Sequence, residues 1–378
     1  MGKIMVVCGE SSGDIHAAKV VKKMKEINND LEIAAMGSEA LKKEGAKILI
    51  DPLELSSIGF VESLKNLKTH LSHIRLLKDY MRNNRPDVIF LVDYSGFNMM
   101  MARIAFKMNI PVVDYFPPTA WIWGKWRAKW MAKYDATIAA TFPMERDIYE
   151  EVGAKVEFVG HPLVDFVGSD KTKEEIYEEF GLKKEEKIIS LMPGSRASEI
   201  DHLSDILFAT AQKLKNENKE YQFLLPLATG IDKKIILEKL QNYDFNLEII
   251  EDSAYEILKI ADLNITASGT ATLESLIMET PMLVVYKTGW STYQLGKRLM
   301  KTNYIAMPNI IAKKEVVPEF VQDEAKANNL YKIASQYLNN AQLLKAKTKE
   351  LAKLKKKLGV KGAVKRVAEL VLEEGGLK

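Results

Sequence analysis

Short stretches of β-branched and apolar residues alternate along the chain with longer segments in which apolar residues recur every three or four positions. The first pattern predicts buried strands, and the second predicts amphipathic helices. Residues 88–92, Val-Ile-Phe-Leu-Val, contain no polar side chain, which is typical of a parallel strand covered on both faces. Comparable strands are expected at residues 3–7, 31–36, 47–50, 111–115, 136–140, 156–159, 187–192, 221–226, 247–250, 263–266 and 282–286. Strands that alternate with helices in this way predict an α/β fold.

The alternation is interrupted by a polar segment, rich in Lys and Glu, at residues 168–186. Because 378 residues are too many for one ordinary core, this segment is expected to link two domains. The predicted domains are residues 1–168 and residues 169–345, each a layer of repeated strand–helix units. Residues 346–378 are expected to form basic C-terminal helices that could pack back on the N-terminal domain.

The charge and the cysteine content argue against a nucleic-acid-binding protein and against a disulfide-stabilised secreted protein. The formal net charge of +3 is too small to indicate that the whole chain binds nucleic acid. Residues 345–366 carry ten basic residues and one acidic residue; such a run is usually a solvated helix face, and attraction to an anionic surface is the alternative. The single cysteine, Cys8, excludes a disulfide framework and is typical of a reducing compartment.

Less regular loops are expected at residues 308–311 and 318–322.

Neither a membrane span nor a targeting segment is predicted. The chain enters a strand at Lys3, which leaves no room for a signal peptide. No apolar run reaches the ~18 residues that a spanning helix needs. We therefore expect a cytoplasmic protein that is attached at most to a membrane surface.

A candidate phosphate site lies in the second half. Ser268, Gly269 and Thr270 follow a predicted strand and precede a helical pattern that ends at Pro281. Such a turn points unpaired backbone N–H groups and the positive end of a helix dipole at one spot. Glu274 lies one helical turn beyond Thr270, where its carboxylate could accept hydrogen bonds from ribose hydroxyls. The alternative is an ordinary strand-to-helix connection with a Ser/Thr cap and a solvated Glu.

A similar turn follows the predicted strand 187–192. It contains Gly194, Ser195 and Arg196, and the planar, permanently charged guanidinium of Arg196 could bind a phosphate or a base edge. The G-x-G-x-x-G fingerprint is absent from the sequence, which weakens a dinucleotide-binding hypothesis.

The first half places a carboxylate at the end of its central strand. Asp93 directly follows residues 88–92, and the carboxyl ends of strands in open α/β sheets border the ligand crevice. Asp93 could therefore act as a general base, or it could cap the next loop. His16 begins the helix after the Gly-rich segment 9–14 and is a second catalytic candidate; a surface or packing role is its alternative.

Tryptophans and cations alternate between residues 121 and 133. The aromatic members are Trp121, Trp123, Trp126 and Trp130, and the cations are Lys125, Arg127, Lys129 and Lys133. This combination suits a membrane interface that carries anionic lipid. Stacking of nucleic-acid bases on the aromatics is a rival hypothesis, and tertiary packing of the indoles beside solvated lysines is the third.

Two Rossmann-like halves, with the phosphate-type turn in the second, resemble the GT-B glycosyltransferases. A set of short motifs occurs in order: Gly9-Glu10-Ser11-Ser12-Gly13-Asp14, Gly59-Phe60-Val61-Glu62, Asp93 with Phe97-Asn98, Pro118 with Trp121 and Trp123, 158–163, 192–196 with Glu199-Ile200, 268–274, and Pro318-Glu319 with Gln322. In this order they resemble the lipid-A-disaccharide synthase family. The chain departs from the family at Ser95-Gly96, where many members carry Pro-Asp or Pro-Gly, so the acceptor contacts are less defined than the donor contacts.

The resemblance implies two Rossmann-like domains that face each other across a cleft. It also implies an inverting transfer of 2,3-diacylglucosamine from UDP to 2,3-diacylglucosamine 1-phosphate (lipid X). The products would be the β-1,6 lipid A disaccharide 1-phosphate and UDP. No cofactor and no bound metal are implied.

Individual roles follow from the resemblance. Asp93 would be the base, and His16 would position sugar or phosphate. The donor contacts would be Gly194, Ser195, Arg196, Ser268, Gly269, Thr270, Glu274, Asn309, Glu319 and Gln322. The acceptor and membrane contacts would be Ser12, Asn98, Trp121, Trp123, Trp126 and Arg127.

The implied partners are the two acylated sugars and the cytoplasmic face of the inner membrane, without nucleic acid, and a homodimer is one possible assembly. Two alternatives remain at this point. A UDP-N-acetylglucosamine epimerase could use the same architecture on a water-soluble substrate. A non-catalytic adaptor for lipid or RNA could use residues 121–133. This alternative would not explain the phosphate-type turns at Arg196 and Ser268.

Overall fold

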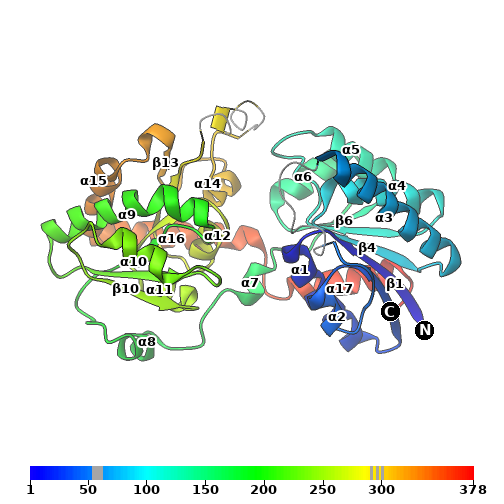
Figure 1. Ribbon diagram of the computed structural model, residues 1–378, viewed down its shortest axis with the longest axis horizontal. Coiled ribbons are helices and arrows are strands. Elements are labelled where there is room, and N and C mark those ends of the chain that lie inside the picture. Colours follow the sequence, from blue (N-terminus) through cyan, green and yellow to red (C-terminus); the bar gives the residue numbers. More distant parts are fainter. Residues whose placement is uncertain (53–62, 290–292, 295–297, 299–301) are drawn as a thin grey trace. The chain divides into compact units, whose positions relative to one another are not determined.

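The computed structural model describes residues 1–52, 63–289, 293–294, 298 and 302–378 (Figure 1). The chain divides into two compact units, the first formed by Met1–Asp165 together with Leu358–Lys378 and the second by Phe166–Lys357. Each unit is built on one parallel sheet with helices on both faces (Figure 1). The basic C-terminal segment is shared between the units, because its first helix belongs to the second unit and its last helix to the first.

The strands of the first unit lie in the order β3-β2-β1-β4-β5-β6-β7. Their bounds are β1 (Gly2–Cys8), β2 (Leu31–Met36), β3 (Lys47–Ile50), β4 (Val88–Val92), β5 (Val112–Tyr115), β6 (Thr137–Ala140) and β7 (Lys155–Phe158). The helices are α1 (Ser11–Ile27), α2 (Glu39–Lys43), α3 (Ser63–Asn83), α4 (Ser95–Lys107), α5 (Trp126–Lys133), α6 (Pro143–Glu151), α7 (Leu163–Phe166) and α17 (Ala363–Glu374).

The two faces of this sheet bury different helices because successive strand residues point to opposite sides. On β1, Ile4, Val6 and Cys8 belong to the core that contains α1 and α17. Met5 and Val7 belong to the opposite core, which contains residues of α3, α4, α5 and α6. The last helix, α17, thus completes the core of the first unit by packing on α1, β4 and β5.

One acidic residue of the first Gly-rich turn has a structural task. The buried carboxylate of Asp14 accepts hydrogen bonds from the backbone N–H groups of Ser38 at 2.7 Å and Ala40 at 2.8 Å. These N–H groups belong to the start of α2, where a helix has no internal acceptors for them. Asp14 therefore fixes α2 to the beginning of α1.

The strands of the second unit lie in the order β10-β9-β8-β11-β12-β13. Their bounds are β8 (Ile188–Met192), β9 (Gln222–Leu227), β10 (Leu247–Glu251), β11 (Leu263–Ala267), β12 (Met282–Tyr286) and β13 (Glu319–Val321). The α-helices are α8 (Lys173–Glu179), α9 (Ala197–Glu217), α10 (Lys233–Leu240), α11 (Ala254–Ile260), α12 (Thr270–Ile277), α14 (Met307–Ala312), α15 (Ala327–Leu338) and α16 (Ala341–Lys355). Two short 3₁₀ turns are η1 (Gln322–Glu324) and η2 (Lys356–Leu358).

The strand register determines which loops can meet. Thr266 of β11 pairs with Met192 of β8, and Leu227 of β9 pairs with Glu251 of β10. All these strands are parallel, so the loops that follow β8, β9, β10 and β11 leave the sheet at its carboxyl edge. In the first unit, Val92 pairs with Cys8 and Tyr115, which places Asp93 between the segments that begin at Gly9 and Phe116.

Candidate active site

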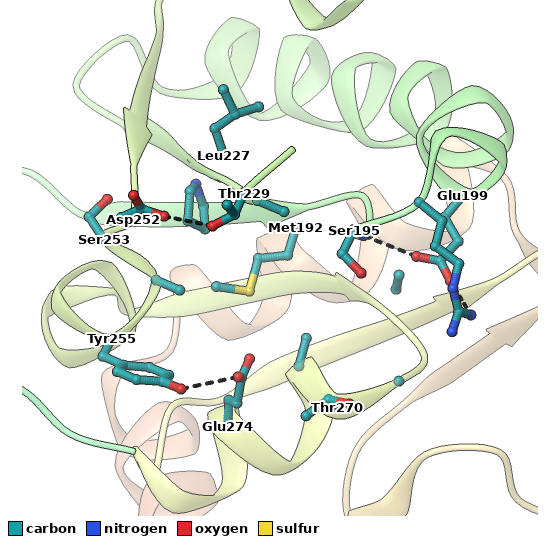
Figure 2. A pocket seen from close by; sticks show the side chains of 18 of the residues that line it. Met192, Ser195, Glu199, Leu227, Thr229, Asp252, Ser253, Tyr255, Thr270 and Glu274 are labelled. Atoms are coloured by element: carbon teal, nitrogen blue, oxygen red, sulfur yellow. Dashed lines mark hydrogen bonds and ion pairs between the residues drawn. The ribbon is translucent and has the colours of Figure 1, made fainter. Parts of the chain in front are cut away.

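A pocket of about 470 Å³ opens at the carboxyl edge of the second sheet (Figure 2). It collects residues that lie far apart in the sequence, from the ends of β8, β9, β10 and β11 and from the helices that follow them. The lining residues are Met192, Gly194, Ser195, Arg196, Glu199, Pro226, Leu227, Ala228, Thr229, Asp252, Ser253, Ala254, Tyr255, Ala267, Ser268, Gly269, Thr270, Ala271 and Glu274. Both turns singled out in the sequence therefore line one pocket.

The turn between β11 and α12 leaves the start of α12 uncapped by any side chain. Its N-cap residue is Gly269, whose backbone is extended with φ of 170°, and a Cβ added there would meet no atom within 4 Å. Ser268 turns its hydroxyl away from the helix start and donates to the carbonyl of Ile305 at 3.0 Å. The first N–H groups of α12 thus face open space, as an anion site at a helix N-terminus requires.

The loop between β8 and α9 is held by Glu199. Its Oε2 accepts a hydrogen bond from the backbone N–H of Ser195 at 3.0 Å, and its Oε1 pairs with Nη1 of Arg196 at 3.3 Å (Figure 2). Gly194 has φ of +123°, and a Cβ at this position would lie 2.3 Å from Oε2 of Glu199. The Arg196 side chain remains 80% exposed, so its guanidinium keeps most of its donors free for a ligand.

The acidic side of the pocket is formed by Glu274. The hydroxyl of Tyr255 donates to Oε1 of Glu274 at 3.4 Å (Figure 2). Burial raises the pKa of Glu274, and the hydrogen bond from Tyr255 opposes this shift. Burial together with the Glu274 charge raises the pKa of Tyr255 to about 12, so the phenol stays a donor near neutral pH. The remaining carboxylate lone pairs of Glu274 can accept hydrogen bonds from two neighbouring hydroxyls of a ligand.

Several lining residues were not identified from the sequence, among them Thr229, Asp252 and Tyr255. Thr229 donates to Oδ1 of Asp252 at 2.9 Å, and this pair lies opposite the Tyr255–Glu274 pair in the pocket (Figure 2). None of these three residues belongs to a recognisable motif. Their one signal in the sequence is that each lies just beyond a predicted strand, where ligand-binding side chains of α/β sheets concentrate.

Asn309, Glu319 and Gln322, which the resemblance assigned to the donor side, do not line this pocket. Glu319 accepts hydrogen bonds from the N–H groups of Ile305 at 2.9 Å and Ala306 at 3.0 Å, and from Nδ2 of Asn309 at 2.7 Å. Since the Ile305 carbonyl accepts from Ser268, Glu319 is connected through one residue to the α12 turn.

The other two amides also bind backbone. Asn309 is fully buried, and its Oδ1 accepts from the N–H groups of Val316 and Val317. Gln322 makes a paired contact with the backbone of Thr288, accepting at 2.8 Å and donating at 2.9 Å. A role of these residues in binding would therefore act through the loops that they hold.

In the first unit, Asp93 follows β4 in a left-handed conformation with φ of +44°. Its carboxylate is partly exposed, and its Oδ2 lies 3.5 Å from the hydroxyl of Ser12. Burial and the nearby Glu10 charge raise the pKa of Asp93, while the hydrogen bond from Ser12 lowers it. The Asp93 carboxylate is thus partly desolvated, with a raised pKa, and can still be reached from solvent.

His16 packs against aromatic rings at the same edge. Its ring centroid lies 4.8 Å from that of Phe116, which in turn contacts His161 at 6.2 Å. Burial, with a smaller contribution from Lys19, lowers the pKa of His16 to about 4. Burial and the proximity of His16 lower the pKa of His161 to about 3. Both imidazoles are therefore neutral at physiological pH, and Nδ1 of His16 has no partner in the described part of the chain.

Asn98 and Arg127, expected at the acceptor or membrane surface, point into the first unit instead. Asn98 is 1% exposed and lies beside Asp114, whose pKa burial raises well above its ordinary value. Arg127 is 6% exposed; it stacks on the ring of Trp123 at 3.9 Å and donates to the carbonyls of Thr119 and Trp123. The guanidinium of Arg127 thus holds the loop before α5 together, because it satisfies backbone carbonyls there.

The tryptophans of this stretch differ in exposure. Trp121 is only partly exposed, whereas Trp123, Trp126 and Trp130 are 42%, 51% and 41% exposed. Trp126 and Trp130 meet edge to face at 5.8 Å. The motif at residues 59–62 lies outside the described residues.

No helix among the described residues is both long and apolar enough to cross a bilayer. Within the same part of the chain, no group of three or more His, Cys, Asp or Glu side chains is placed to hold a metal ion.

Comparison with solved structures identifies the class of this architecture. The MurG protein of Acinetobacter baumannii matches with a TM-score of 0.64 and 15% identity, over 99% of this chain and 100% of that one. A UDP-GlcNAc 2-epimerase from Neisseria meningitidis, solved with UDP-GlcNAc bound, matches with a TM-score of 0.62 and 15% identity, over 98% of this chain and 100% of that one. The fold is therefore that of the GT-B glycosyltransferases, as predicted.

The sequence comparisons identify the family. The family model for lipid-A-disaccharide synthetase matches residues 4–373. A lipid-A-disaccharide synthase from Geobacter sulfurreducens is 35% identical over 371 residues, which cover 98% of this chain and 97% of the relative. The chain belongs to the lipid-A-disaccharide synthetase family and is a glycosyltransferase, which confirms the resemblance that its motifs indicated.

Proposed function

We propose that this enzyme transfers 2,3-diacylglucosamine from UDP to the 6-hydroxyl of 2,3-diacylglucosamine 1-phosphate, with inversion at the anomeric carbon. The products are the β-1,6 disaccharide 1-phosphate and UDP. The observation that carries the proposal is the pocket in the second unit, where an uncapped helix start, an exposed Arg196 and the Glu274 carboxylate line one space. These three features suit the diphosphate and the ribose of a UDP-sugar.

The donor would be held by complementary charges. The diphosphate accepts hydrogen bonds from N–H groups at Gly269 and Thr270 and from the Arg196 guanidinium, all of which favour a negative charge. The ribose hydroxyls donate to Glu274, whose orientation Tyr255 fixes. The same groups stabilise the additional charge on UDP as it departs, which is the contribution that lowers the barrier.

The acceptor would be activated in the first unit by Asp93. Its carboxylate takes the proton of the 6-hydroxyl while that oxygen attacks the anomeric carbon from the face opposite UDP. The new bond joins O6 to the anomeric carbon, the bond between this carbon and the diphosphate oxygen breaks, and its electron pair leaves with UDP. Neutral His16, whose side chain is partly exposed, is available to orient a sugar hydroxyl or a phosphate of the acceptor.

Product analysis tests the proposal directly. The protein is incubated in detergent micelles with UDP-2,3-diacylglucosamine and lipid X, and the lipids are examined by mass spectrometry and NMR. We expect a tetra-acyl disaccharide monophosphate with a β-anomeric proton coupling, in amounts equal to the UDP released. An α-linkage would disprove inversion, and UDP release without disaccharide would disprove the acceptor.

A parallel incubation addresses the epimerase alternative. UDP-N-acetylglucosamine is supplied alone, and its 2-epimer is sought by the same methods. Formation of the 2-epimer, with no disaccharide from the acylated substrates, would replace the transferase proposal by the epimerase.

A further inference from the structure

A groove of about 440 Å³ lies between α3 and α4 of the first unit. Five of its lining side chains are apolar, and the other four are cations. The apolar members are Leu71, Ile74, Met100, Ile104 and Met108, and the cations are Lys78, Arg82, Arg103 and Lys107. Since none of the described residues adds an acidic or neutral polar side chain to this lining, the natural ligand of the groove combines hydrocarbon with negative charge.

The cations are available to a ligand. Arg82 pairs with Asp79 at 3.4 Å, on the surface of α3. Lys78, Arg103 and Lys107 make no side-chain hydrogen bond or ion pair with any described residue of the chain. Three cations that have no partner in the described part of the chain repel each other beside one groove, and an anion between them removes this repulsion.

The apolar side chains also lack protein partners on one side. Leu71 is 43% exposed and Met100 is 38% exposed, although both belong to helices whose other faces are buried. Apolar side chains lining a groove gain free energy when hydrocarbon replaces water against them. The groove therefore offers an acyl chain the contacts that a small anion would leave unused.

The two chemistries are arranged along the groove. On α3 the order is Leu71, Ile74, Lys78 and Arg82, so the apolar residues come first and the cations last. On α4 the order is Met100, Arg103, Ile104 and Lys107, with Met108 just beyond the helix, so the cations lie in its second half beside further apolar residues. Both helices run from the carboxyl edge of the sheet toward its amino edge, as crossover helices of a parallel sheet do. A lipid would therefore lie with its headgroup near the amino edge.

This position separates the groove from the catalytic edge. Asp93 lies two residues before the start of α4 at Ser95, and Lys107 is the last residue of that helix. At ~1.5 Å per residue, Lys107 is roughly 18 Å further along the helix axis than Ser95. An acceptor whose phosphate rested at Lys107 would thus have its headgroup far from Asp93, which favours a separate lipid.

The neighbouring helices extend the positive surface. Among the described side chains of α3, α4 and α5, the exposed cations are Arg75, Arg82, Arg103, Lys107, Lys129 and Lys133, and the exposed acidic residue is Asp79. Helix α4 packs against both α3 and α5. A bilayer containing anionic lipid is attracted to such a surface, whereas base stacking needs aromatic rings and the groove lining has none.

We propose that the α3–α4 groove binds one anionic phospholipid of the bilayer, with an acyl chain along Leu71, Ile74 and Met100 and the phosphate between Lys78, Arg103 and Lys107. The site is independent of the transfer reaction, because it uses none of the residues assigned to the donor or to Asp93. Its ligand is a structural or regulatory lipid and is not consumed.

The experiment compares two double variants of the full chain with equal loss of charge. Arg103→Gln with Lys107→Gln removes two cations of the groove. Lys129→Gln with Lys133→Gln removes two exposed cations of α5, outside the groove. Binding of phosphatidylglycerol is measured in zwitterionic micelles by native mass spectrometry and by fluorescence titration, without either sugar substrate.

The wild type and the α5 variant are expected to bind one phosphatidylglycerol per chain. The groove variant should bind it roughly 10- to 30-fold more weakly, because each cation near an anionic lipid contributes about a fivefold factor. Equal losses in both variants would show general attraction to charge and overturn the proposal. So would full competition by inorganic phosphate, or by single-stranded RNA, because neither supplies an acyl chain.

Met100→Ser tests the apolar half of the groove. Because Met100 is 38% exposed, its replacement is expected to leave the unfolding temperature almost unchanged. If Met100→Ser lowers the affinity for long-chain phosphatidylglycerol more than the affinity for short-chain phosphatidylglycerol, the acyl contact is supported. Unchanged affinity for both lipids would show that the acyl chain does not lie in the groove. Failure of the disaccharide synthesis would leave these binding results intact, so the two proposals fail separately.

Discussion

The two units present different chemistry at the same place in similar sheets. At the carboxyl edge of the second sheet, the pocket is lined by main-chain N–H groups, an exposed Arg196 and hydrogen-bonded pairs such as Tyr255 with Glu274. At the carboxyl edge of the first sheet, the titratable groups are desolvated, with the pKa of Asp93 raised and that of His16 lowered. The second edge is suited to hold a charged group, and the first to accept a proton.

The difference comes from what stabilises charge at each edge. Fixed dipoles and a guanidinium favour an anion without changing their own protonation, so their attraction for a diphosphate should not vary with pH near neutrality. Burial without a counter-ion disfavours the charged form of Asp93, which makes this carboxylate more basic. Substitutions in the first unit should therefore change the chemical step, and those in the second unit should change nucleotide affinity.

Asp93→Asn should have the largest effect on catalysis. Loss of a general base typically reduces the rate by ~10²–10⁴-fold, while the UDP pocket belongs to the other unit and is unchanged. We expect kcat to fall by this factor and the UDP dissociation constant, measured by calorimetry, to stay within twofold of the wild type. Ser12→Ala, which removes only the 3.5 Å hydrogen bond to Asp93, is the milder control. A kcat of Asp93→Asn near that of the wild type would exclude it as the base.

The pH dependence should distinguish Asp93 from His16. The base works only when it is deprotonated, so activity is present above the raised pKa of Asp93 and falls about tenfold per pH unit below it. His16, with a pKa lowered to about 4, stays neutral above pH 5 and contributes no limb between pH 5 and 8. The kcat/KM profile of His16→Gln should therefore keep the acid limb of the wild type. If that limb vanished in His16→Gln, the titrating group would be the imidazole.

The strands could be predicted because each corresponds to a short run of apolar residues that is visible in the local sequence. Residues 88–92 form β4 with the predicted bounds, since five consecutive apolar residues are stable only when both faces are covered. By contrast, β13 (Glu319–Val321) and α14 (Met307–Ala312) lie in the region predicted to be less regular. Three and six residues are too few for a periodic pattern, and both elements depend on partners distant in the sequence.

The parts of the candidate site that could be predicted are the turns whose backbone N–H groups face the pocket. The turns at Gly194 and Gly269 were visible as glycines between a strand and a helix, and both line the pocket. The inward direction of Arg127 was not visible, because only the fold shows that the carbonyls of Thr119 and Trp123 need a donor. The same reason hides the contact of Glu319 with two N–H groups near α14.

Glu274→Ala should weaken nucleotide binding without a comparable change in stability. Hydrogen bonds to a charged group contribute about 1.5–3 kcal/mol, so we expect the UDP dissociation constant to rise by roughly 10- to 100-fold. Tyr255→Phe removes one neutral donor to Glu274 at 3.4 Å and should cost about tenfold or less. Calorimetry with UDP and with 2′-deoxy-UDP provides the check, because the deoxy nucleotide should be less sensitive to Glu274→Ala. Equal sensitivity would mean that Glu274 does not contact the ribose.

The smallest and most selective effects should come from the two glycines of the pocket. Gly194→Ala places a Cβ 2.3 Å from Glu199 in a left-handed conformation, which should cost about 1–3 kcal/mol and lower the unfolding temperature of the second unit by a few degrees. Gly269→Ala adds a methyl group that meets no protein atom, in an extended backbone that any residue adopts. It should leave the unfolding temperature unchanged and weaken UDP binding, because the methyl occupies space over the start of α12. Scanning calorimetry and UDP titration of both variants separate the two effects. Tight UDP binding by Gly269→Ala would mean that the diphosphate does not lie at this turn.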